Sequence, residues 1–387
     1  MRVISESEFP LTGGYSRPEP ATAAASAGDC TVRRVDPAQW DAQFADFRDI
    51  VHEQSACFNL ARWPAGSLQF LAVERQGRII GGAVVRTVSA PANIARLSIL
   101  RWGPLWRPAH REPDPANLQR IFDALIDELV HRQKSYLLVI PRSDPEYAAV
   151  EGELLRDRGF EAVYQPPAPE RYFVDVDMPA DQAMASLNQK WRYNLRKSQK
   201  HDLRFEWHHG ASGAALFQPV FEQMMSRKNF YDSSPVDSLE QIAVADAEAL
   251  RPEFAIVFEK DEPVAAAAID MSGERSIYLY GATNKRGNAL RAGYFMQWEI
   301  VQRLCKTPRI RWYDLGGATS DGCSLHQFKR GLTGKSGVVS DIPPYFGKGS
   351  DVRQILFGKA ALKSRLMKFQ MQKQLHDFLP AFLKQSA

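Results

Sequence analysis

The sequence predicts an α/β (α+β) protein of two consecutive domains, each with a mixed sheet, followed by a basic C-terminal helix. The chain of 387 residues is long enough for two or three domains with substantial cores. An apolar segment at 277–280, an amphipathic helix over 290–304 and a second apolar segment at 310–314 give the strand–helix–strand order that connects parallel strands. Strands and helices follow a similar order in the first half, so we expect two domains of one type.

Residues 1–30 precede the first expected domain. They are rich in Ala, Ser, Gly and Pro and lack an apolar core segment, which predicts a flexible leader and not a signal peptide. Hydrophobic residues make up 44% of the chain and charged residues 24%, as in soluble globular proteins, and no apolar run is long enough to span a bilayer. The cysteines, Cys30, Cys57, Cys305 and Cys323, form no CxxC pair, which suits a reducing compartment and argues against structural zinc.

The first domain is expected over residues 31–177. Its first helix, at 36–47, has aromatic residues on one side. A second helix, at 117–132, has an apolar stripe at helical spacing, and a third, at 148–158, is followed by a glycine. The expected strands are 68–73, 79–88, 95–100, 136–140 and 171–176. A proline-rich segment, 165–169, precedes the last strand, and together they are candidates for a crossover between the domains.

The second domain is expected over residues 178–350. It begins with a basic helix at 182–200, whose apolar residues recur at helical spacing. The other expected helices are 216–228, 239–250 and 290–304, and the expected strands are 203–207, 254–259, 263–271, 276–280 and 310–314. Residues 351–387 form the expected tail, an amphipathic basic helix. Such a helix either lies on a membrane surface or packs on a domain with its basic side exposed.

Several motifs carry a family resemblance. The segments AGYFMQWE (292–299), WYDLGG (312–317) and LHQFKRGLTG (325–334) resemble the signature region of the FemABX-type peptidyltransferases, a group that includes FemAB-like and CelD-like acyltransferases. The basic helix WRYNLRK (191–197) resembles the family's helix at the start of the second domain, and RWGPL (101–105) resembles a first-domain segment. The resemblance implies two tandem GNAT-like domains, with the main site in the second. It also implies aminoacyl or acyl transfer to an amine of a cell-envelope precursor.

Lys329 and Asp314 are the expected catalytic residues. In acyl transfer the carbonyl oxygen gains negative charge as an amine attacks, and a fixed cation stabilises that charge. In the family the lysine after this phenylalanine lies at the reaction centre, so the resemblance assigns that role to Lys329. Asp314 follows a strand and can orient or deprotonate the amine. The alternatives are a surface lysine and an aspartate that caps a turn, and His326 is a weaker candidate base.

Arg192, Arg196 and Lys197 are the expected binders of an anionic group. Guanidinium groups bind phosphate in a bidentate manner, and in the family this helix lines the cleft that holds a pyrophosphate-bearing substrate. A solvated basic helix face is the alternative. The other expected substrate-binding residues are Trp191, Tyr280, Tyr313 and Phe328. Aromatic residues in strands also form protein cores, and this alternative applies to both tyrosines.

The donor is open between aminoacyl-tRNA and acyl-CoA. The turn with which ordinary GNAT enzymes bind acetyl-CoA, Q/R-x-x-G-x-G/A, is not intact at 284–293, and no long helical hairpin of the kind that contacts tRNA in some family members is visible. GLTGKS (331–336) ends like a P-loop but lacks its first glycine and follows no strand. We expect no metal and no tightly bound cofactor.

The expected partners are a cell-envelope precursor of peptidoglycan or polysaccharide type and, if it is the donor, tRNA; DNA is not expected. We expect a cytoplasmic protein, with peripheral contact to the inner membrane surface if the tail binds lipid. Two alternative functions remain. One is an acyl-CoA-dependent N-acyltransferase in exopolysaccharide or envelope biosynthesis. The other is a non-enzymatic basic scaffold that binds RNA or anionic lipid through 190–200 and the tail.

Overall fold

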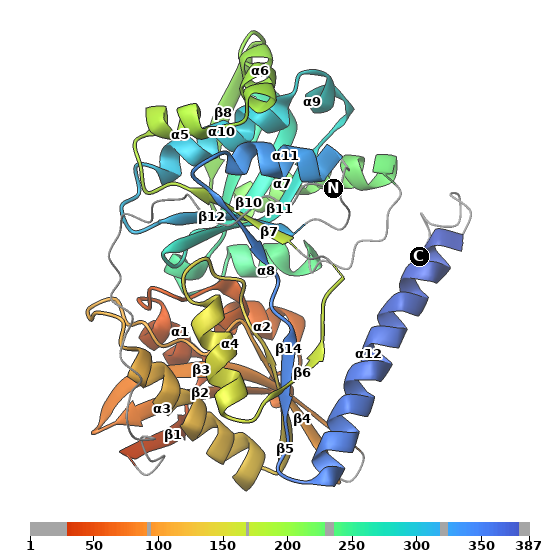
Figure 1. The fold of residues 1–387 in the computed structure, drawn as a ribbon. Coiled ribbons are helices and arrows are strands. Elements are labelled where there is room, and N and C mark those ends of the chain that lie inside the picture. Colours follow the sequence, from red (N-terminus) through yellow and green to blue (C-terminus); the bar gives the residue numbers. More distant parts are fainter. Residues whose placement is uncertain (1–28, 91–93, 168–169, 229–235, 318–323, 379–387) are drawn as a thin grey trace, which may run out of the picture.

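The computed structural model describes residues 29–90, 94–167, 170–228, 236–317 and 324–378. They form two α/β domains, one above the other in Figure 1, and one long helix that runs beside them. Each domain contains a mixed sheet of seven strands. The predicted fold class, with two domains of one type and a C-terminal helix, is confirmed.

The two sheets have the same plan. The first has the order β1-β2-β3-β4-β5-β14-β6 and the second, read in the equivalent direction, β8-β9-β10-β11-β12-β7-β13. One neighbouring pair in each sheet is parallel, β4 with β5 and β11 with β12, and the other pairs are antiparallel. The first sheet consists of β1 (Cys30–Arg34), β2 (Leu68–Arg75), β3 (Arg78–Ser89), β4 (Arg96–Arg101), β5 (Ser135–Ile140), β6 (Glu161–Tyr164) and β14 (Tyr345–Lys348). The second consists of β7 (Glu170–Asp175), β8 (Leu203–His208), β9 (Glu253–Glu259), β10 (Glu262–Asp270), β11 (Arg275–Thr283), β12 (Trp312–Gly317) and β13 (Val338–Asp341).

Two strands, β7 and β14, are exchanged between the domains. β7 follows β6 in the sequence but pairs with β12 and β13 of the second sheet. β14 follows β13 but pairs with β5 and β6 of the first sheet. The expected domain limits therefore need correction, because 170–175 completes the second sheet and 345–348 completes the first. The predicted crossover at β7 is confirmed.

Helices cover the sheets with apolar stripes. In the first domain α3 (Pro115–Ile126) begins where Asp114 accepts a hydrogen bond of 2.9 Å from the Ala116 N–H. Leu118, Ile121 and Leu125 of α3 are buried against the sheet, as their spacing predicts. The other first-domain helices are α1 (Pro37–Phe44), α2 (Ala56–Arg62) and α4 (Ala148–Asp157). The second-domain helices are α5 (Ala180–Ser186), α6 (Gln189–Ser198), α7 (Gly210–Lys228), α8 (Leu239–Ala243), α9 (Lys285–Ala289), α10 (Ala292–Leu304) and α11 (Ser324–Thr333).

The expected basic helix at 182–200 is two helices, α5 and α6. The chain leaves helical geometry at Leu187 and Asn188, whose ψ angles are 148° and 143°. The Asn188 side chain then caps α6 by accepting a hydrogen bond from the Lys190 N–H. The expected helix at 239–250 is likewise shorter, because α8 ends at Ala243.

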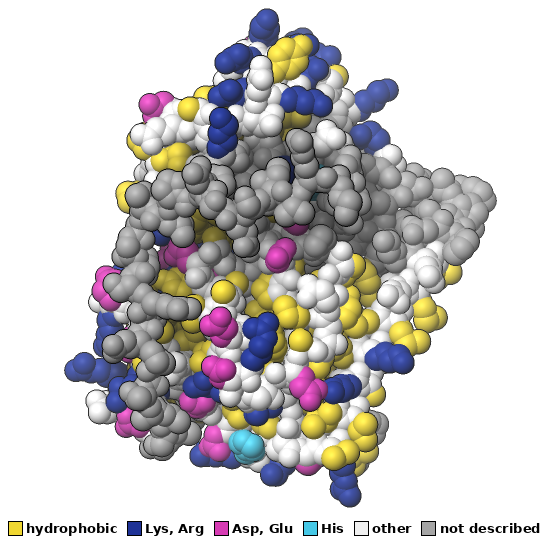
Figure 2. Space-filling view, in the orientation of Figure 1, with side chains coloured by type: hydrophobic (Ala, Val, Ile, Leu, Met, Phe, Trp, Pro, Cys, Tyr) yellow, Lys and Arg dark blue, Asp and Glu magenta, His cyan; other side chains and the backbone are white. Residues whose placement is uncertain are grey.

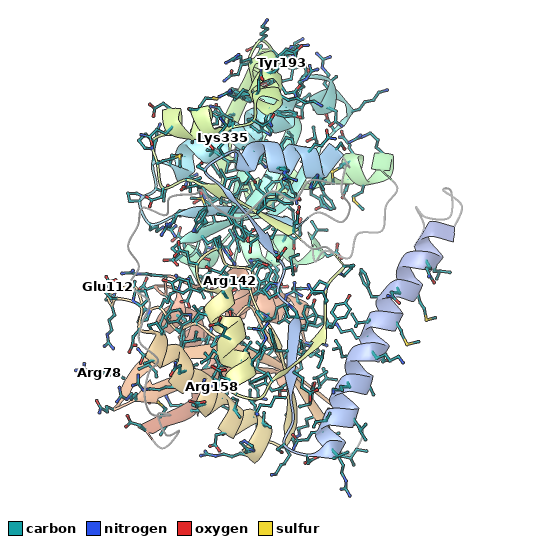
Figure 3. The ribbon with its side chains drawn as sticks, viewed as in Figure 1. Arg78, Glu112, Arg142, Arg158, Tyr193 and Lys335 are labelled. Atoms are coloured by element: carbon teal, nitrogen blue, oxygen red, sulfur yellow. The ribbon has the colours of Figure 1, made fainter. Side chains whose placement is uncertain are left out.

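Buried arginines join the two domains. Arg107 and Arg142 of the first domain and Arg275 of the second converge on Asp144, with N–O distances of 4.0, 3.3 and 3.8 Å. Arg107 also pairs with Glu274 across the interface. Burial raises the pKa of Asp144, but the three arginine charges lower this pKa by a larger amount and hold it at about 2, below the ordinary 3.8. Figure 3 shows Arg142 at the boundary between the domains.

The tail forms α12 (Val352–Phe378), as predicted. Leu362 is buried against β4 and β5 of the first sheet, so the first half of the helix packs on that domain. From there α12 runs along the side of the molecule toward the level of the second domain (Figure 1). Among the described residues, no helix is both long and apolar enough to cross a membrane.

Candidate active site

The parallel strands β11 and β12 separate toward their carboxyl ends. Three residue pairs join them, from Arg275–Trp312 to Ile277–Asp314, and both strands then continue without pairing to each other. In the first domain, β4 and β5 instead pair over six residues, up to Arg101–Ile140. Ligands of such sheets bind beyond the carboxyl ends of parallel strands. The opening between β11 and β12 is therefore the place to look for a site in the second domain.

Lys329 of α11 reaches the carboxyl end of β12. Its side chain is 8% exposed, and its Nζ donates a hydrogen bond of 2.7 Å to the carbonyl of Gly317, the last residue of β12. Gly316 has φ of +75°, a backbone conformation that favours glycine, and a Cβ there would lie 3.6 Å from Nζ. Lys329 is therefore at a strand end, as expected.

Asp314 is fully buried beneath the turn formed by Gly316 and Gly317 at the end of β12. Both of its carboxylate oxygens accept hydrogen bonds of 2.8 Å from Arg171 Nε, and Oδ1 also accepts from the Gly316 N–H at 2.9 Å. Arg275 Nε lies 3.7 Å from Oδ2. These protein donors surround the carboxylate, so we do not retain the expectation that it takes a proton from substrate. Its position is that of a group that orients the Gly316–Gly317 turn.

An aromatic pocket of about 360 Å³ lies between α6 and α11. Trp191, Tyr294 and Phe328 line it, with ring centroids 4.8 to 5.9 Å apart. Lys190 and Arg330, both exposed, add positive charge to its lining. The structure thus brings together two of the expected substrate-binding residues, Trp191 and Phe328. Phe328 directly precedes Lys329 in the sequence.

His326 also lines this aromatic pocket. Its Nε2 lies 3.4 Å from Oε2 of Glu170, and this oxygen accepts a hydrogen bond of 2.6 Å from the Tyr172 hydroxyl. That hydrogen bond holds the pKa of Glu170 below its usual value. His326 lies one helical turn before Lys329, so both side chains are on neighbouring parts of α11. A histidine beside a carboxylate is a suitable proton acceptor.

Arg192, Arg196 and Lys197 lie outside this pocket, on the outer side of α6. Arg192 donates a hydrogen bond of 3.0 Å to the carbonyl of Ala185, Arg196 is exposed, and Lys197 Nζ lies 4.6 Å from the ring centroid of Tyr193. Figure 2 shows Lys and Arg side chains gathered over this end of the molecule, and Figure 3 places Tyr193 there. The expected phosphate binders thus form an exposed basic surface above the pocket.

The two expected strand tyrosines have different positions. Tyr313 is fully buried, and its hydroxyl donates a hydrogen bond of 2.9 Å to Gln297 Oε1. It belongs to the core, and the expectation of a substrate contact is corrected. Tyr280 is half-buried and packs beside the apolar cluster of α7, β9 and β10. It does not line the aromatic pocket.

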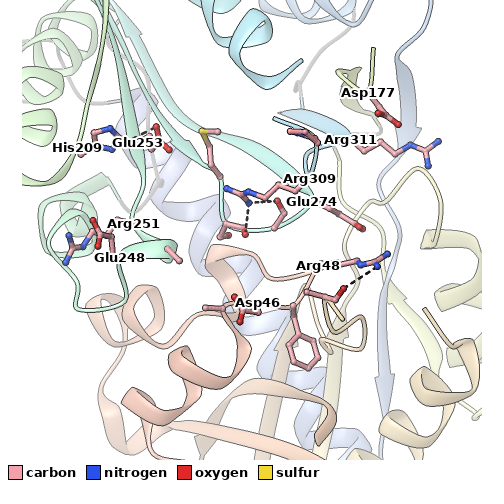
Figure 4. Close-up of a pocket in the computed structure, with 18 residues that line it drawn as sticks. Asp46, Arg48, Asp177, His209, Glu248, Arg251, Glu253, Glu274, Arg309 and Arg311 are labelled. Atoms are coloured by element: carbon pink, nitrogen blue, oxygen red, sulfur yellow. Dashed lines mark hydrogen bonds and ion pairs between the residues drawn. The ribbon is translucent and has the colours of Figure 1, made fainter. Parts of the chain in front are cut away.

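A larger cavity of about 890 Å³ lies between the domains (Figure 4). Two of its arginines already have partners: Arg309 donates to the carbonyls of Ser272 and Gly273, and Arg311 pairs with Glu146 at 2.8 Å. Where the lining includes the parallel strands of the second sheet, it comes from the hairpin before β11 and the loop before β12, which lie at the amino ends of these strands. We therefore assign the chemistry to the opposite end of the sheet.

Sequence reasoning did not find Glu170 as the neighbour of His326. Glu170 is the first residue of the exchanged strand β7, and nothing in its local sequence indicates that it meets α11. Among the residues that the structure describes, no cluster of three or more side chains has the composition of a metal site.

Part of the second domain matches a described family model. Residues 185–330 match the family described as Acetyltransferase (GNAT) domain. No curated protein matches the sequence. Among solved structures, FemX is similar over 82% of this chain and 96% of its own, with 15% identity and a TM-score of 0.64. The expected resemblance to the FemABX family is thereby confirmed at the level of the fold.

Two further structures have the same fold. The C-terminal domain of a putative lysylphosphatidylglycerol synthetase from Agrobacterium fabrum covers 86% of this chain and 97% of its own, with 13% identity and a TM-score of 0.50. A conserved protein of unknown function from Bacteroides thetaiotaomicron covers 82% and 98%, with 12% identity and a TM-score of 0.54.

Proposed function

We propose that this chain is an acyltransferase that moves an aminoacyl or acyl group onto an amine of a cell-envelope component. The observation that carries the proposal is the buried ammonium group of Lys329 at the open carboxyl end of β11 and β12, one residue from an aromatic pocket. The GNAT domain match over 185–330 and the FemX fold support the same reaction class.

In the proposed reaction the acceptor amine attacks the carbonyl carbon of the donor ester or thioester. The carbonyl oxygen then carries negative charge, and the Lys329 ammonium group donates a hydrogen bond to it. A C–N bond forms, the attacking nitrogen gives its proton to His326, and the C–O or C–S bond to the donor breaks. The leaving oxygen or sulfur takes a proton, so an amide and the free donor carrier are released.

Asp314 has a positioning role in this mechanism. It binds Arg171 and the Gly316 N–H, and so holds the turn whose Gly317 carbonyl receives the Lys329 hydrogen bond. His326 replaces Asp314 as the proposed base because it lines the pocket and has Glu170 at 3.4 Å to stabilise its protonated form.

For the donor we favour aminoacyl-tRNA. Lys190 of α6 lines the pocket, and Arg196 and Lys200 are exposed on the same part of the chain, where they can bind a nucleic-acid backbone. Acyl-CoA is the second candidate, because the matched family is an acetyltransferase domain and, among the described residues, no side chain caps the first N–H groups of α10. Both donors are made in the cytoplasm, so we propose that the protein acts there, on a peptidoglycan-type or polysaccharide precursor.

A donor-competition assay tests the proposal. Purified protein and an extract of envelope precursors receive either radiolabelled aminoacyl-tRNA or radiolabelled acetyl-CoA, each with and without RNase. RNase-sensitive label in the lipid or muropeptide fraction supports the first donor, and label from acetyl-CoA alone supports the second. Label from neither donor, under conditions in which the protein is folded, contradicts the proposed function and leaves the basic scaffold as the better account.

A further inference from the structure

Four arginines surround one carboxylate in the first domain. Arg62 of α2, Arg86 of β3, Arg101 of β4 and Arg365 of α12 line a small cavity together with Glu53. Glu53 is 8% exposed, and its Oε1 lies 2.9 Å from Arg101 Nε and 3.6 Å from Arg62 Nη1. One negative charge therefore faces four positive charges that come from four separate elements.

Two of these arginines lack a negative partner. Among the described residues, neither Arg86 nor Arg365 forms an ion pair with an acidic side chain, and Arg86 Nε is buried without a hydrogen bond. Burial and then the charge of Arg365 lower the pKa of Arg86, and burial and then the charge of Arg101 lower the pKa of Arg365. Guanidinium groups that lie close together and are partly shielded from solvent repel one another, and an anion bound between them would relieve this repulsion.

The position of the cavity is that of a ligand site. Arg101 and Ile140, the last residues of the parallel strands β4 and β5, both line it. This is the carboxyl end of the parallel pair, where α/β sheets bind ligands. The guanidinium of Arg86 also stacks 3.5 Å above the ring of Trp63, which fixes its orientation toward the cavity.

The size of the cavity limits the ligand group. Its volume is about 40 Å³. A water molecule needs roughly 10–15 Å³ of such space, so the cavity holds about three or four oxygen-sized atoms. This is the size of the oxygens of one phosphate group, and it is too small for a sugar, a base or an amino acid.

We propose that the arginine cluster, defined as Arg62, Arg86, Arg101 and Arg365, binds a single phosphoryl group of the acceptor. Guanidinium groups recognise phosphate by bidentate hydrogen bonds, and the four elements that supply them preorganise the site. This inference deepens the proposed function and rests on it for the statement that the phosphorylated ligand is the acceptor. The binding of phosphate itself does not depend on it.

The cluster lies near a contact between the two domains. Next to Arg101, Trp102 stacks under Arg171 at 4.6 Å, and Arg171 binds Asp314 of β12. A short series of packed side chains therefore joins the cluster to the second-domain site, which supports assigning the bound phosphate to the acceptor.

The phosphate has two candidate sources, a lipid headgroup and a soluble phosphate ester. Beyond Arg365, α12 exposes Met367, Met371 and Leu375 alongside Lys368, so an apolar and basic surface adjoins the cluster. Figure 2 shows hydrophobic and basic side chains together along this helix. A lipid headgroup would place its acyl chains beside this surface, whereas a soluble ester would not need it.

Calorimetric titration of the full chain with inorganic phosphate, at constant ionic strength, tests the proposal. Each charge-assisted hydrogen bond lost should weaken binding about 10- to 100-fold. We expect weakening of at least about tenfold in Arg86→Gln and in Arg365→Gln. Arg365 is on the exposed side of α12, so its substitution leaves folding intact. Arg78→Gln is the matched control, because Arg78 is exposed at the start of the same strand as Arg86 (Figure 3).

The source of the phosphate is decided by two further arms. If it is a lipid headgroup, vesicles with phosphatidylglycerol should sediment the wild-type chain more than Arg365→Gln, and vesicles of phosphatidylcholine alone should sediment neither. If it is a soluble ester, glycerol 3-phosphate should compete with inorganic phosphate and the vesicles should not bind. Equal phosphate affinity in wild type, Arg86→Gln and Arg365→Gln, or no phosphate binding by the wild type, overturns the proposal. Either result leaves the transfer reaction itself untouched, since no donor is present.

Discussion

Replacement of Lys329 by methionine is the sharpest test of the proposed chemistry. Methionine retains much of the side-chain length and apolar volume but removes the ammonium group. Loss of one donor to a developing oxyanion lowers kcat by about 10²- to 10³-fold in comparable sites. The Gly317 carbonyl also loses its 2.7 Å hydrogen bond, and a buried acceptor left unsatisfied costs about 1–3 kcal/mol of folding free energy. We therefore expect a large loss of rate with a modest loss of stability.

The assay compares transfer rates and thermal unfolding for Lys329→Met, the wild type and a control, Lys335→Met. Lys335 is an exposed lysine just after α11, so its loss should change neither quantity (Figure 3). Rates are measured with saturating donor at a temperature well below both unfolding midpoints. If folded Lys329→Met transfers within about threefold of the wild-type rate, the loss is far below the expected 10² and the assignment of Lys329 to the oxyanion is refuted.

Three further predictions concern charged groups. Asp314→Asn should lower the free energy of unfolding by about 3–5 kcal/mol in urea, because it leaves Arg171 buried without its partner; a loss of kcat at unchanged stability would instead restore Asp314 as the base. His326→Asn should lower kcat by about 10²- to 10⁴-fold at unchanged stability, because the attacking nitrogen loses its proposed proton acceptor; a rate equal to that of the wild type contradicts the proposed base. The arginine charges, that of Arg142 foremost, hold the pKa of Asp144 at about 2, below the ordinary 3.8. The ionised carboxylate therefore stabilises the protein by roughly 2 kcal/mol above about pH 4, and this contribution is lost as the pH falls toward 2. Urea unfolding of wild type and Asp144→Asn should therefore differ at pH 5 and converge near pH 2.5, and a constant difference argues against this linkage.

Much of the fold is predictable because its longer elements have strong periodic patterns. Leu118, Ile121 and Leu125 recur at helical spacing and are buried on α3, and the long apolar strands of both sheets are where the sequence predicts them. The short strands were not predictable. β6, β13 and β14 have four residues each, too few to show alternation, and their partners are far away in the sequence. For this reason the pairing of β14 with the first sheet could not be derived from local patterns, whereas the crossover at β7 was expected from the proline-rich segment that precedes it.

The candidate site shows the same limit. The resemblance located Lys329, Phe328 and Trp191 correctly at one end of the second domain, because these residues belong to contiguous motifs. It did not show that Tyr313 is core, since a strand pattern identifies alternating faces but not which face meets a helix. The pairing of His326 with Glu170 depends on the exchanged strand β7, so it required the tertiary structure.

The two sheets have the same strand order but differ at the carboxyl ends of their parallel strands. This difference suggests that the two domains have different roles. In the first sheet β4 and β5 stay paired to their last residues, and arginines close the end with room for about one phosphate group. In the second sheet β11 and β12 pair over three residues only, and Lys329 lies at the carboxyl end of β12. Arg171 touches both halves, because it stacks over Trp102 of the first domain and binds Asp314 of the second. Since Arg171 belongs to the exchanged strand β7, a shift of one domain against the other would move the carboxylate that holds the Gly316–Gly317 turn. The strand exchange therefore ties the geometry around Lys329 to the position of the domain that we propose binds the acceptor phosphate.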